Sequence, residues 1–334
     1  VVHVHRVQTI ENIKVSWDEV VSHKKAAGAY RAPSATMAAF AMESNMDEVA
    51  RELGLDPLEF RYANAAGEGD LMASDTPWPS IGLKKCLERL REHPDWTGRN
   101  TDKKPHRGVG FAVAGWPGMT AAASSICRVD TTGKVTVYVS AIDISGAHSS
   151  LALVAAEVLG TSADAVEVVL EGTRHGLATP ASGGSAITHS LAGAVENAAT
   201  KVRERIVQVA ADQFEAAAED IEITDGKVHV KGVPDTSVSL GELAGKLQNS
   251  FDGPGPPVAE GRSDFSSNSP GFVAHLVVVD VDPDTGHVQP VKYLAIQDAG
   301  FALNPLMVEG QMTGGAVQCI GWGLHEALIH DEHG

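Results

Sequence analysis

Between residues 34 and 92 the hydrophobic positions recur every three or four residues, which is the period of a helix with one buried face. The first such stripe consists of Met37, Phe40, Ala41, Met46, Val49, Ala50 and Leu53. Helices are therefore predicted over residues 34–53, 56–64 and 81–92. Ser34 is suited to the N-cap of the first helix, and Gly54 is expected to end it. Residues 1–32 are predicted to be extended, and the polar residues 94–105 to form a linker between two domains.

After that linker, hydrophobic and polar residues alternate with the two-residue period of β-strands. Strands are predicted over residues 108–115, 121–130, 134–140 and 166–170, and hairpins over 221–230 and 272–296. Helices are predicted over residues 151–159 and from residue 191 to about 215. Residues 249–270 are rich in Gly, Pro and Ser and are predicted to form a surface loop. Because helices and strands are mixed without a regular βαβ repeat, the predicted fold class is α+β, with mixed sheets and flanking helices.

Composition excludes several classes of function. The chain carries 26 basic and 43 acidic residues, and its net charge of −17 disfavours binding to nucleic acid or anionic membranes. No apolar run reaches the roughly 20 residues of a membrane span, and the N-terminus lacks the pattern of a secretory signal. Cys86, Cys127 and Cys319 are odd in number and far apart, which argues against a disulfide framework and favours a cytoplasmic location.

The first candidate site is the segment GAYRAP, residues 28–33, directly before the long N-terminal helix. An arginine beside a helix N-terminus combines a fixed cation with unpaired backbone N–H groups, which suits an anion. The alternative is a surface arginine ahead of a capped helix. The residue types in this segment do not decide between an anion site and a surface arginine.

Two further segments combine small residues with a following helix. Residues 141–150, AIDISGAHSS, leave backbone N–H groups accessible to a ligand, although His148 is also suited to a helix start. Residues 181–188, ASGGSAIT, have the glycines and hydroxyls of a phosphate cradle. A flexible loop shares that composition and is the alternative.

The most informative segment is VKYLAIQDAGFALNPLMVEGQMTGGAVQCIGWGLHE, residues 291–326. A strand breaks at Asp298 and a turn follows at Asn304, after which the apolar run contains Gly310, Gly314, Gly315 and Gly321. Each glycine costs a helix roughly 1 kcal/mol relative to alanine. Several glycines together indicate backbone held close to a ligand or, alternatively, to a tightly packed helix.

Histidine is frequent, with 14 residues, but the spacing does not predict a zinc site. His325 and His330 are five residues apart, which on a helix separates them by roughly 140°, so with Glu326 they do not match HExxH. His3 and His5 share one face of an extended segment without a third ligand.

Taken in order, these motifs resemble those of the xanthine oxidase (molybdenum hydroxylase) family. Residues 298–326 are similar to its signature DxGxxxNPxxxxGQxxGGxxQxIGxGLxE, and residues 28–64 to its arginine motif and the helices after it. The resemblance implies the fold of the molybdenum-cofactor-binding domains. Residues 1–100 would be the end of the first molybdopterin-binding domain with its helical segment, and residues 101–334 the second, truncated at its C-terminal end.

In that family these segments contact a pterin that holds molybdenum through its dithiolene, so no protein ligand to the metal is expected. The cofactor-binding residues carried over are Tyr30, Arg31, Ala32, Ser145, Gly146, Ala147, Gly183, Gly184, Ser185, Asn304 and Gln311. Gln311 would hydrogen-bond the pterin, and Asn304 would hold the turn. The sequence departs from the family where residues 145–147 replace a glutamine-bearing loop and where Ala186 replaces a frequent arginine.

The resemblance implies a hydroxylase or dehydrogenase that oxidises a carbon centre with oxygen from water. The expected cofactor is molybdopterin, as its cytosine dinucleotide, with iron–sulfur (2Fe–2S) and FAD centres on partner subunits. The family's general-base glutamate lies beyond the end of this chain, and Glu326 belongs to an earlier motif, so no catalytic residue is assigned. The chain is therefore expected to act only with the remaining part of the molybdenum subunit, an iron–sulfur subunit and an FAD subunit.

Two other functions remain open at this stage. The first is a cofactor-binding or scaffold subunit that has lost catalysis, because the loop glutamine is missing. The second is an unrelated α/β binding protein. The substrate is not fixed by the sequence, although Ala-Pro-Ser after Arg31 replaces the cysteine loop of carbon monoxide dehydrogenases and so disfavours carbon monoxide.

Overall fold

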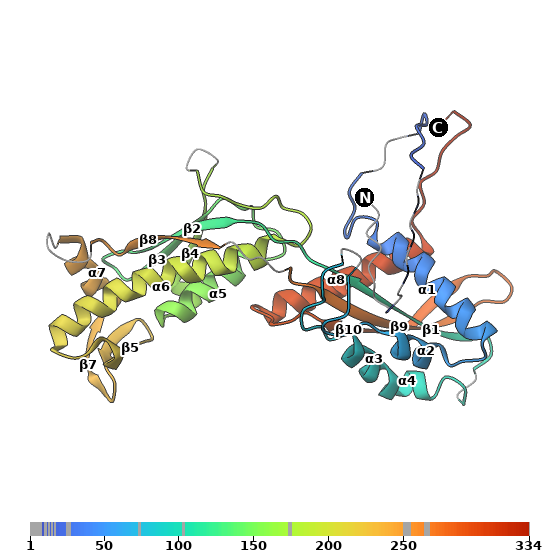
Figure 1. Cartoon of the computed structure of the whole chain (residues 1–334), viewed down its shortest axis with the longest axis horizontal. Helices are drawn as coiled ribbons and strands as arrows, with labels where there is room; N and C mark the ends of the chain where they lie inside the picture. Colours follow the sequence, from blue (N-terminus) through green and yellow to red (C-terminus); the bar gives the residue numbers. More distant parts are fainter. Residues whose placement is uncertain are drawn as a thin grey trace. The chain divides into compact units, whose positions relative to one another are not determined.

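The computed structural model describes residues 9, 12, 14, 16, 18–24, 28–72, 75–101, 104–172, 176–249, 255–263 and 268–333. The chain forms two compact units (Figure 1). Unit 1 comprises Val1–Pro117, Pro270–Phe301 and Val308–Gly334. Unit 2 comprises Gly118–Ser269 and Ala302–Met307. Each unit combines helices with a sheet, so the predicted α+β class is confirmed.

Unit 1 is built on an antiparallel sheet with the strand order β1-β9-β10. The strands are β1 (Arg107–Trp116), β9 (Gly271–Val281) and β10 (Val288–Asp298). The helices are α1 (Ala35–Glu52), α2 (Pro57–Asn64), α3 (Leu83–Glu92), α4 (Pro94–Thr97) and α8 (Pro305–Leu324), the first turn of which lies in unit 2. In Figure 1, α3 and α4 lie below this sheet and the rest of α8 above it.

Along β9 the side chains alternate between buried and half-buried, so the two faces of the sheet have different surroundings. Even-numbered residues of β9 pack into the core between the sheet and the helices α2 and α3: Phe272, Ala274, Leu276 and Val278. Val273 and His275 point the opposite way and line a cavity shared with α8. A strand with period-two side chains can serve a core and a site at the same time.

A buried ion pair fixes α1 against the rest of unit 1. Glu43 on α1 accepts hydrogen bonds from Arg61 Nε and from the Val113 N–H of edge strand β1, both at 2.8 Å. Arg61 also donates to the Glu43 carbonyl at 2.8 Å and lies over the Phe111 ring. Burial raises the pKa of Glu43, and the Arg61 guanidinium opposes that rise. The pair therefore holds the helix that follows the candidate arginine segment.

Unit 2 contains a four-stranded sheet of order β4-β3-β2-β8, in which only β3 and β4 run parallel. These strands are β2 (Ala123–Val129), β3 (Val135–Val139), β4 (Val166–Leu170) and β8 (Val258–Ser263). The helices α5 (Ala147–Leu159) and α6 (Ile187–Phe214) pack on it. A smaller sheet holds β5 (Ile221–Thr224), β6 (Lys227–Val230) and β7 (Val233–Ser239), followed by α7 (Leu240–Asn249). Short 3-10 turns span Ala163–Ala165 and Ala218–Asp220.

Most predicted elements are confirmed. The hairpin over residues 272–296 forms as β9 and β10, and the predicted strand over residues 166–170 coincides with β4. Asp225 and Gly226 have φ values of 50° and 72°, the left-handed pair that a two-residue hairpin requires. These elements carry strong local signals, so the sequence pattern alone is sufficient for them.

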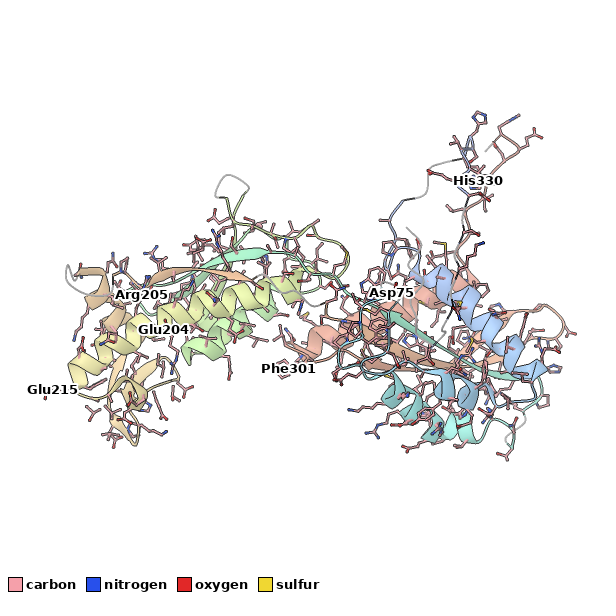
Figure 2. The ribbon with its side chains drawn as sticks, in the orientation of Figure 1. Asp75, Glu204, Arg205, Glu215, Phe301 and His330 are labelled. Carbon is pink, nitrogen blue, oxygen red and sulfur yellow. The ribbon has the colours of Figure 1, made fainter. Side chains whose placement is uncertain are left out.

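The predicted loop over residues 249–270 is wrong in part, because it contains β8. This strand pairs antiparallel with β2 and packs on α6, which carries Arg205, labelled in Figure 2. Arg205 donates hydrogen bonds to the carbonyl oxygens of Pro256 and Val258. A Cβ at Gly261 would lie 2.1 Å from the Ala194 carbonyl oxygen on α6. The glycine that resembled a loop signal instead permits close contact between a strand and a helix.

Other differences concern boundaries and exposure. The segment β7–α7 was not predicted, and α5 and α6 each begin four residues earlier than expected. Ser34 occupies the N-cap position of α1 without a side-chain cap bond. Within the predicted α1 stripe, Met46 and Ala50 are buried whereas Met37 and Phe40 are exposed. The predicted linker over residues 94–105 includes α4, whose Trp96 is in the core.

The compact units divide elsewhere than at this linker, because β1, which follows it, pairs with β9. The assignment of residues 1–100 and 101–334 to two molybdopterin-binding domains stays a prediction. His3 and His5 lie outside the described residues. None of the described helices combines the length and apolar character that a membrane span requires.

Candidate functional site

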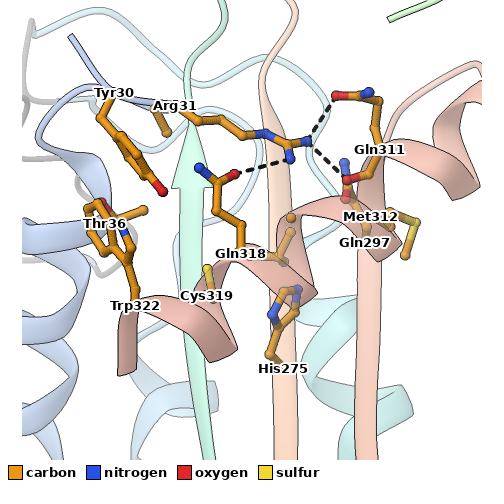
Figure 3. Close-up of a pocket in the computed structure, with 13 residues that line it drawn as sticks. Tyr30, Arg31, Thr36, His275, Gln297, Gln311, Met312, Gln318, Cys319 and Trp322 are labelled. Atoms are coloured by element: carbon orange, nitrogen blue, oxygen red, sulfur yellow. Dashed lines mark hydrogen bonds between the residues drawn. The ribbon is translucent and has the colours of Figure 1, made fainter. Parts of the chain in front are cut away.

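A cavity of ≈ 170 Å³ opens in unit 1 between α8, the sheet and the arginine segment (Figure 3). Residues from five segments line it: Tyr30, Arg31, Ala32, Thr36, Val273, His275, Gln297, Gln311, Met312, Gly315, Gln318, Cys319 and Trp322. Four of the predicted site residues, Tyr30, Arg31, Ala32 and Gln311, are therefore brought together. They come from opposite ends of the sequence.

The Arg31 guanidinium joins the arginine segment to α8. Its Nη2 donates to the Gln311 backbone oxygen at 3.0 Å and to Gln311 Oε1 at 2.9 Å, and its Nη1 donates to Gln318 Oε1 at 3.5 Å. Figure 3 shows the guanidinium between the two glutamine side chains. The predicted meeting of Arg31 and Gln311 in one cavity is confirmed, and their contact with a pterin stays a prediction.

Helical spacing explains why one face of α8 serves the cavity. The α8 residues that line the cavity, Gln311, Met312, Gly315, Gln318, Cys319 and Trp322, fall within an arc of roughly 120° when each residue turns the helix by about 100°. At Gly315 the Arg31 guanidinium lies 3.6 Å from where a Cβ would be, so only a very small side chain leaves it room. Alanine at this position would still make ordinary van der Waals contact with the guanidinium.

The other walls of the cavity offer an aromatic surface and one unpaired hydroxyl. Tyr30 and Trp322 are stacked, with ring centroids 4.7 Å apart and planes inclined by 22°. The Oγ1 atom of Thr36 is buried and has no hydrogen-bond partner among the described residues. Because buried polar atoms are normally paired, this hydroxyl is available to a ligand in the cavity as far as the described residues show.

A neutral titratable group forms the sheet side of the cavity. His275 Nδ1 shares a hydrogen bond of 2.8 Å with the Tyr293 hydroxyl, and burial lowers the pKa of the imidazole. Burial, together with the nearby Cys319 thiol, raises the pKa of Tyr293 to about 12. Burial also raises the pKa of Cys319, and Arg31 opposes that rise. Apart from Arg31, these groups are uncharged near neutral pH.

In unit 2, the predicted residues of the α5 loop lie beside Asn304. Ser145 and Gly146 have φ values of 61° and 70°, and a Cβ at Gly146 would lie 2.4 Å from the Met307 sulfur. Asn304 Oδ1 accepts a hydrogen bond from the Met307 N–H at 3.3 Å. His148 Nε2 shares a hydrogen bond with the Ala141 carbonyl oxygen at 2.8 Å, so the imidazole ring is held within the loop. Ala147 is buried as the first residue of α5.

Gly183, Gly184 and Ser185 lie ahead of α6 in unit 2. Gly184 and Ser185 have φ values of 65° and 64°, and Met119 packs against Gly184. The N-cap position of α6 is Ala186, which has no side-chain oxygen to cap the helix. The anion cradle at this helix start stays a prediction.

Sequence reasoning did not single out Thr36, His275, Gln297, Gln318, Cys319 or Trp322. A signal existed for Gln318 and Trp322, because they follow Gln311 by seven and eleven residues on one helical face. For the others the signal is tertiary. Asp298 has a structural role, since its carboxylate accepts hydrogen bonds from the Gly82 and Gly300 N–H groups at 2.6 Å and 3.0 Å.

Comparisons with known proteins agree with this geometry. A family model described as a molybdopterin cofactor-binding domain matches residues 86–334, and a second model of the same description matches residues 1–65. The nicotine 6-hydroxylase large subunit of Paenarthrobacter nicotinovorans is 29% identical across 95% of this chain and 42% of its own length. A putative xanthine dehydrogenase molybdenum-binding subunit of Escherichia coli strain K12 is 32% identical across 91% of this chain and 42% of its own length.

Among solved structures, quinoline 2-oxidoreductase from Pseudomonas putida 86 is similar, with a TM-score of 0.81 and 28% identity. The match covers 92% of this chain and 42% of that protein. The chain thus spans less than half the length of the relatives that it matches.

Proposed function

Since the chain belongs to the molybdopterin cofactor-binding domain family of the molybdenum hydroxylases, we propose that it is part of the molybdenum–pterin catalytic subunit of a multi-subunit hydroxylase or dehydrogenase. In this proposal the complete enzyme oxidises a carbon centre with oxygen from water. Electrons then leave through iron–sulfur and FAD centres on partner subunits. The cofactor proposed is the cytosine dinucleotide form of molybdopterin.

The observation that carries the proposal is the convergence of Arg31 and Gln311 on one cavity. Amide side chains, a stacked aromatic pair and the unpaired Thr36 hydroxyl surround that space. A planar heterocycle with donors and acceptors along its edge is complementary to this lining. The residues present therefore fit a pterin.

Each predicted segment has a role in this proposal. Residues 30–32 and Gln311 hold the pterin, and Asn304 keeps the turn before α8 in place. Residues 145–147 and 183–185 lie at the starts of α5 and α6, where the phosphates of a dinucleotide would bind. When bound, the cofactor supplies the redox chemistry, and the chain's residues bind and orient it.

We propose that no residue lining this cavity serves as the general base. Among the described residues, no carboxylate lines the cavity. The Glu326 N–H donates to the Gly321 carbonyl, and its carboxylate folds back beside Gly321. We therefore expect the purified chain alone to show no hydroxylase turnover. Robust turnover without the rest of the molybdenum subunit would contradict this assignment.

A second candidate is a cofactor-binding or scaffold subunit without catalysis. It is favoured by residues 145–147, which contain no side chain able to take the place of the family's loop glutamine. The two candidates differ in the metal that the native complex would contain, because a scaffold needs no molybdenum.

The test is to isolate the native complex that contains this chain and identify its subunits by mass spectrometry. Metal analysis and release of the pterin as its fluorescent oxidation product then give the cofactor content. We expect near-stoichiometric molybdenum, a cytosine nucleotide, and iron–sulfur and FAD subunits. A Gln311→Ala complex should lose cofactor, whereas Gln289→Ala, at an exposed glutamine of the same unit, should keep it. A complex without molybdenum or pterin would contradict the proposal.

A further inference from the structure

The larger sheet of unit 2 ends on one side in β4, which pairs with β3 alone among the described residues. Directly after β4, the Glu171 N–H donates to the Val139 carbonyl oxygen of β3 at 2.7 Å. Backbone groups point alternately to the two sides of a strand, so the N–H groups of Val166, Val168 and Leu170 point away from β3. This edge therefore presents a row of donors and acceptors to which another strand can pair.

The β4 edge lacks the features that usually protect a strand from pairing. Its sequence, VEVVL, contains no proline or lysine, and its register with β3 has no bulge. By contrast, β10 at the sheet edge of unit 1 has a bulge between Pro290 and Lys292. The β4 edge is thus suited to accept a strand.

A groove of ≈ 400 Å³ lies beside this edge, between β4 and α5. Val166 and Val168 line it from the strand, and Ala152 and Leu153 line it from the helix. The two valines pair with core residues of β3, so they lie on the face of the sheet that carries the core of unit 2. Leu170, on the same face, is 50% exposed. A half-covered core face at a sheet edge offers apolar side chains of an added strand a place to pack.

The charge of this region determines the chemistry of a suitable partner. Residues 147–171 contain four carboxylates and no lysine or arginine. Asp164 lines the groove, Glu157 is exposed on α5, and Glu167 of β4 pairs with Lys134. A second copy of the chain, with its net charge of −17, would bring the same acidic segment against itself. The complementary partner is therefore basic.

We infer that the β4 edge and the groove beside α5 bind an extended segment of a partner polypeptide in which apolar and basic residues alternate. The segment pairs with β4 through backbone hydrogen bonds, and its apolar side chains enter the groove. The inference goes beyond the proposed function and does not depend on it, because no residue of β4 or α5 lines the cavity of unit 1. Asn304 also lines the groove, where its Oδ1 is already bonded to the Met307 N–H.

The first test titrates a fluorescein-labelled peptide of alternating lysine and valine with the purified chain and follows fluorescence anisotropy. We expect saturable binding. A peptide with glutamate in place of lysine should bind at least about tenfold more weakly, because its charges face the carboxylates of residues 147–171. A lysine–valine peptide with a central proline should also bind at least about tenfold more weakly, because proline removes a donor from the added strand.

Two substitutions at one position separate backbone pairing from side-chain packing. Val168→Ala keeps the backbone N–H, whereas Val168→Pro removes it, and that N–H points away from β3, so the pairing of β3 with β4 is kept. The proline variant should bind the lysine–valine peptide at least about threefold more weakly than the alanine variant. Circular dichroism of both variants checks that the fold is retained.

The groove wall is tested by a substitution on α5 that leaves the strand unchanged. Leu153→Gln replaces a leucine that is 38% exposed and should weaken binding of the lysine–valine peptide by about threefold or more. The matched control is Leu55→Gln, because Leu55 is an exposed leucine of unit 1 outside the groove. The control variant should bind the peptide as the wild type does.

Hydrogen exchange followed by mass spectrometry locates the bound peptide. At saturation, the amides of residues 166–170 should exchange at least about tenfold more slowly than in the free chain. The edge strand β7 of the smaller sheet is the internal control and should change by less than about twofold. Equal slowing at both edges would show general attraction of a basic peptide to an acidic chain and would overturn the inference.

The remaining outcomes are equally decisive. Absence of binding, or binding that Val168→Pro and Leu153→Gln both leave unchanged, overturns the inference. Equal affinity for the lysine and glutamate peptides removes the basic partner and overturns it as well. Sedimentation equilibrium of the chain alone should show a monomer. A dimer that Val168→Pro dissociates would assign the edge to a second copy of the chain instead.

Discussion

Arg61 carries a charge into the core of unit 1, with a side chain only 1% exposed. Its partner Glu43 is also buried and accepts a hydrogen bond from the Val113 N–H on the sheet edge. Together they connect α1, α2 and β1, and α1 begins directly after the segment that contains Arg31. Losing one partner of a buried pair is much more destabilising than losing both, because the remaining charge stays desolvated.

Replacing Arg61 with methionine should therefore lower the free energy of unfolding by about 3–5 kcal/mol. A matched control is Arg262→Met, since Arg262 forms an ion pair with Glu260 while 81% exposed, and such pairs contribute about 1 kcal/mol or less. Urea unfolding of both variants gives the two values. Equal losses would show that the Glu43–Arg61 pair contributes no more than a surface pair.

His275 should make stability depend on pH in a defined direction. Burial lowers its pKa below the ordinary 6.5, so the unfolded chain takes up the proton before the folded chain does. The contribution of His275 to stability is then constant above about pH 6.5 and is lost as the pH decreases from there toward the lowered pKa. The neighbours Tyr293 and Cys319 stay uncharged in this range, because the pKa of each is raised.

The measurement is the free energy of unfolding between about pH 7.5 and pH 5.5 for the wild type and His275→Asn. Asparagine retains a polar atom near the position of Nδ1, so the hydrogen bond with the Tyr293 hydroxyl can persist. The variant should lose less stability over that interval than the wild type. An identical pH dependence for the two proteins would rule out His275 as the source.

At the level of elements, the contact between β8 and α6 depends on the absence of a side chain at Gly261. A Cβ there would lie 2.1 Å from the Ala194 carbonyl oxygen and 2.3 Å from the Ala198 nitrogen, and both are backbone atoms of α6. Gly261→Ala should destabilise unit 2 by about 3 kcal/mol or more, at the upper end of overpacking costs.

Gly110 on β1 provides the control for this substitution. It is also a strand glycine, but no heavy atom lies within 4 Å of where its Cβ would be. Gly110→Ala should change the free energy of unfolding by less than about 0.5 kcal/mol. Thermal unfolding followed by circular dichroism compares the two variants. Similar effects at both positions would mean that β8 and α6 can move apart at little cost in free energy.

The elements that the sequence predicts are those with strong local patterns. The β9–β10 hairpin has long alternation and a clear turn, and α1 has a helical stripe ended by Gly54. The strand β8 was not predicted because its glycine and flanking prolines describe a loop locally, whereas its partner β2 is distant in sequence. Starts of α5 and α6 were placed late because glycines and hydroxyls precede them.

Some residues of the candidate site could likewise be identified from the sequence, and others could not. Arg31 and Gln311 could be named from motif resemblance, and Gln318 from the helical period of α8. His275 and Thr36 could not, because their relevance depends on which face of β9 and α1 turns to the cavity. Tertiary packing decides which face of a strand or helix turns to the cavity, and the sequence pattern does not show what lies opposite that face.

For the whole molecule, the two hydrophobic cores are separate sets of residues. One lies in unit 1 and includes Leu87, and the other lies in unit 2 and includes Leu243, both fully buried. The tryptophans that the structure describes, at positions 78, 96, 116 and 322, all belong to unit 1, and the fifth, at position 17, lies outside the described residues. Tryptophan fluorescence therefore reports on unit 1, while far-ultraviolet circular dichroism also includes the 28-residue α6 of unit 2.

Leu87→Ala and Leu243→Ala test whether each core stabilises its own unit. Each substitution should cost about 2–5 kcal/mol where it is made, because it leaves a cavity in a close-packed core. Leu87→Ala should shift the urea transition seen by fluorescence. Leu243→Ala should leave that transition in place and shift the part of the circular dichroism change that fluorescence does not follow. If both substitutions shift both signals equally, the units unfold as one cooperative system, and the separate cores do not define separate folding units.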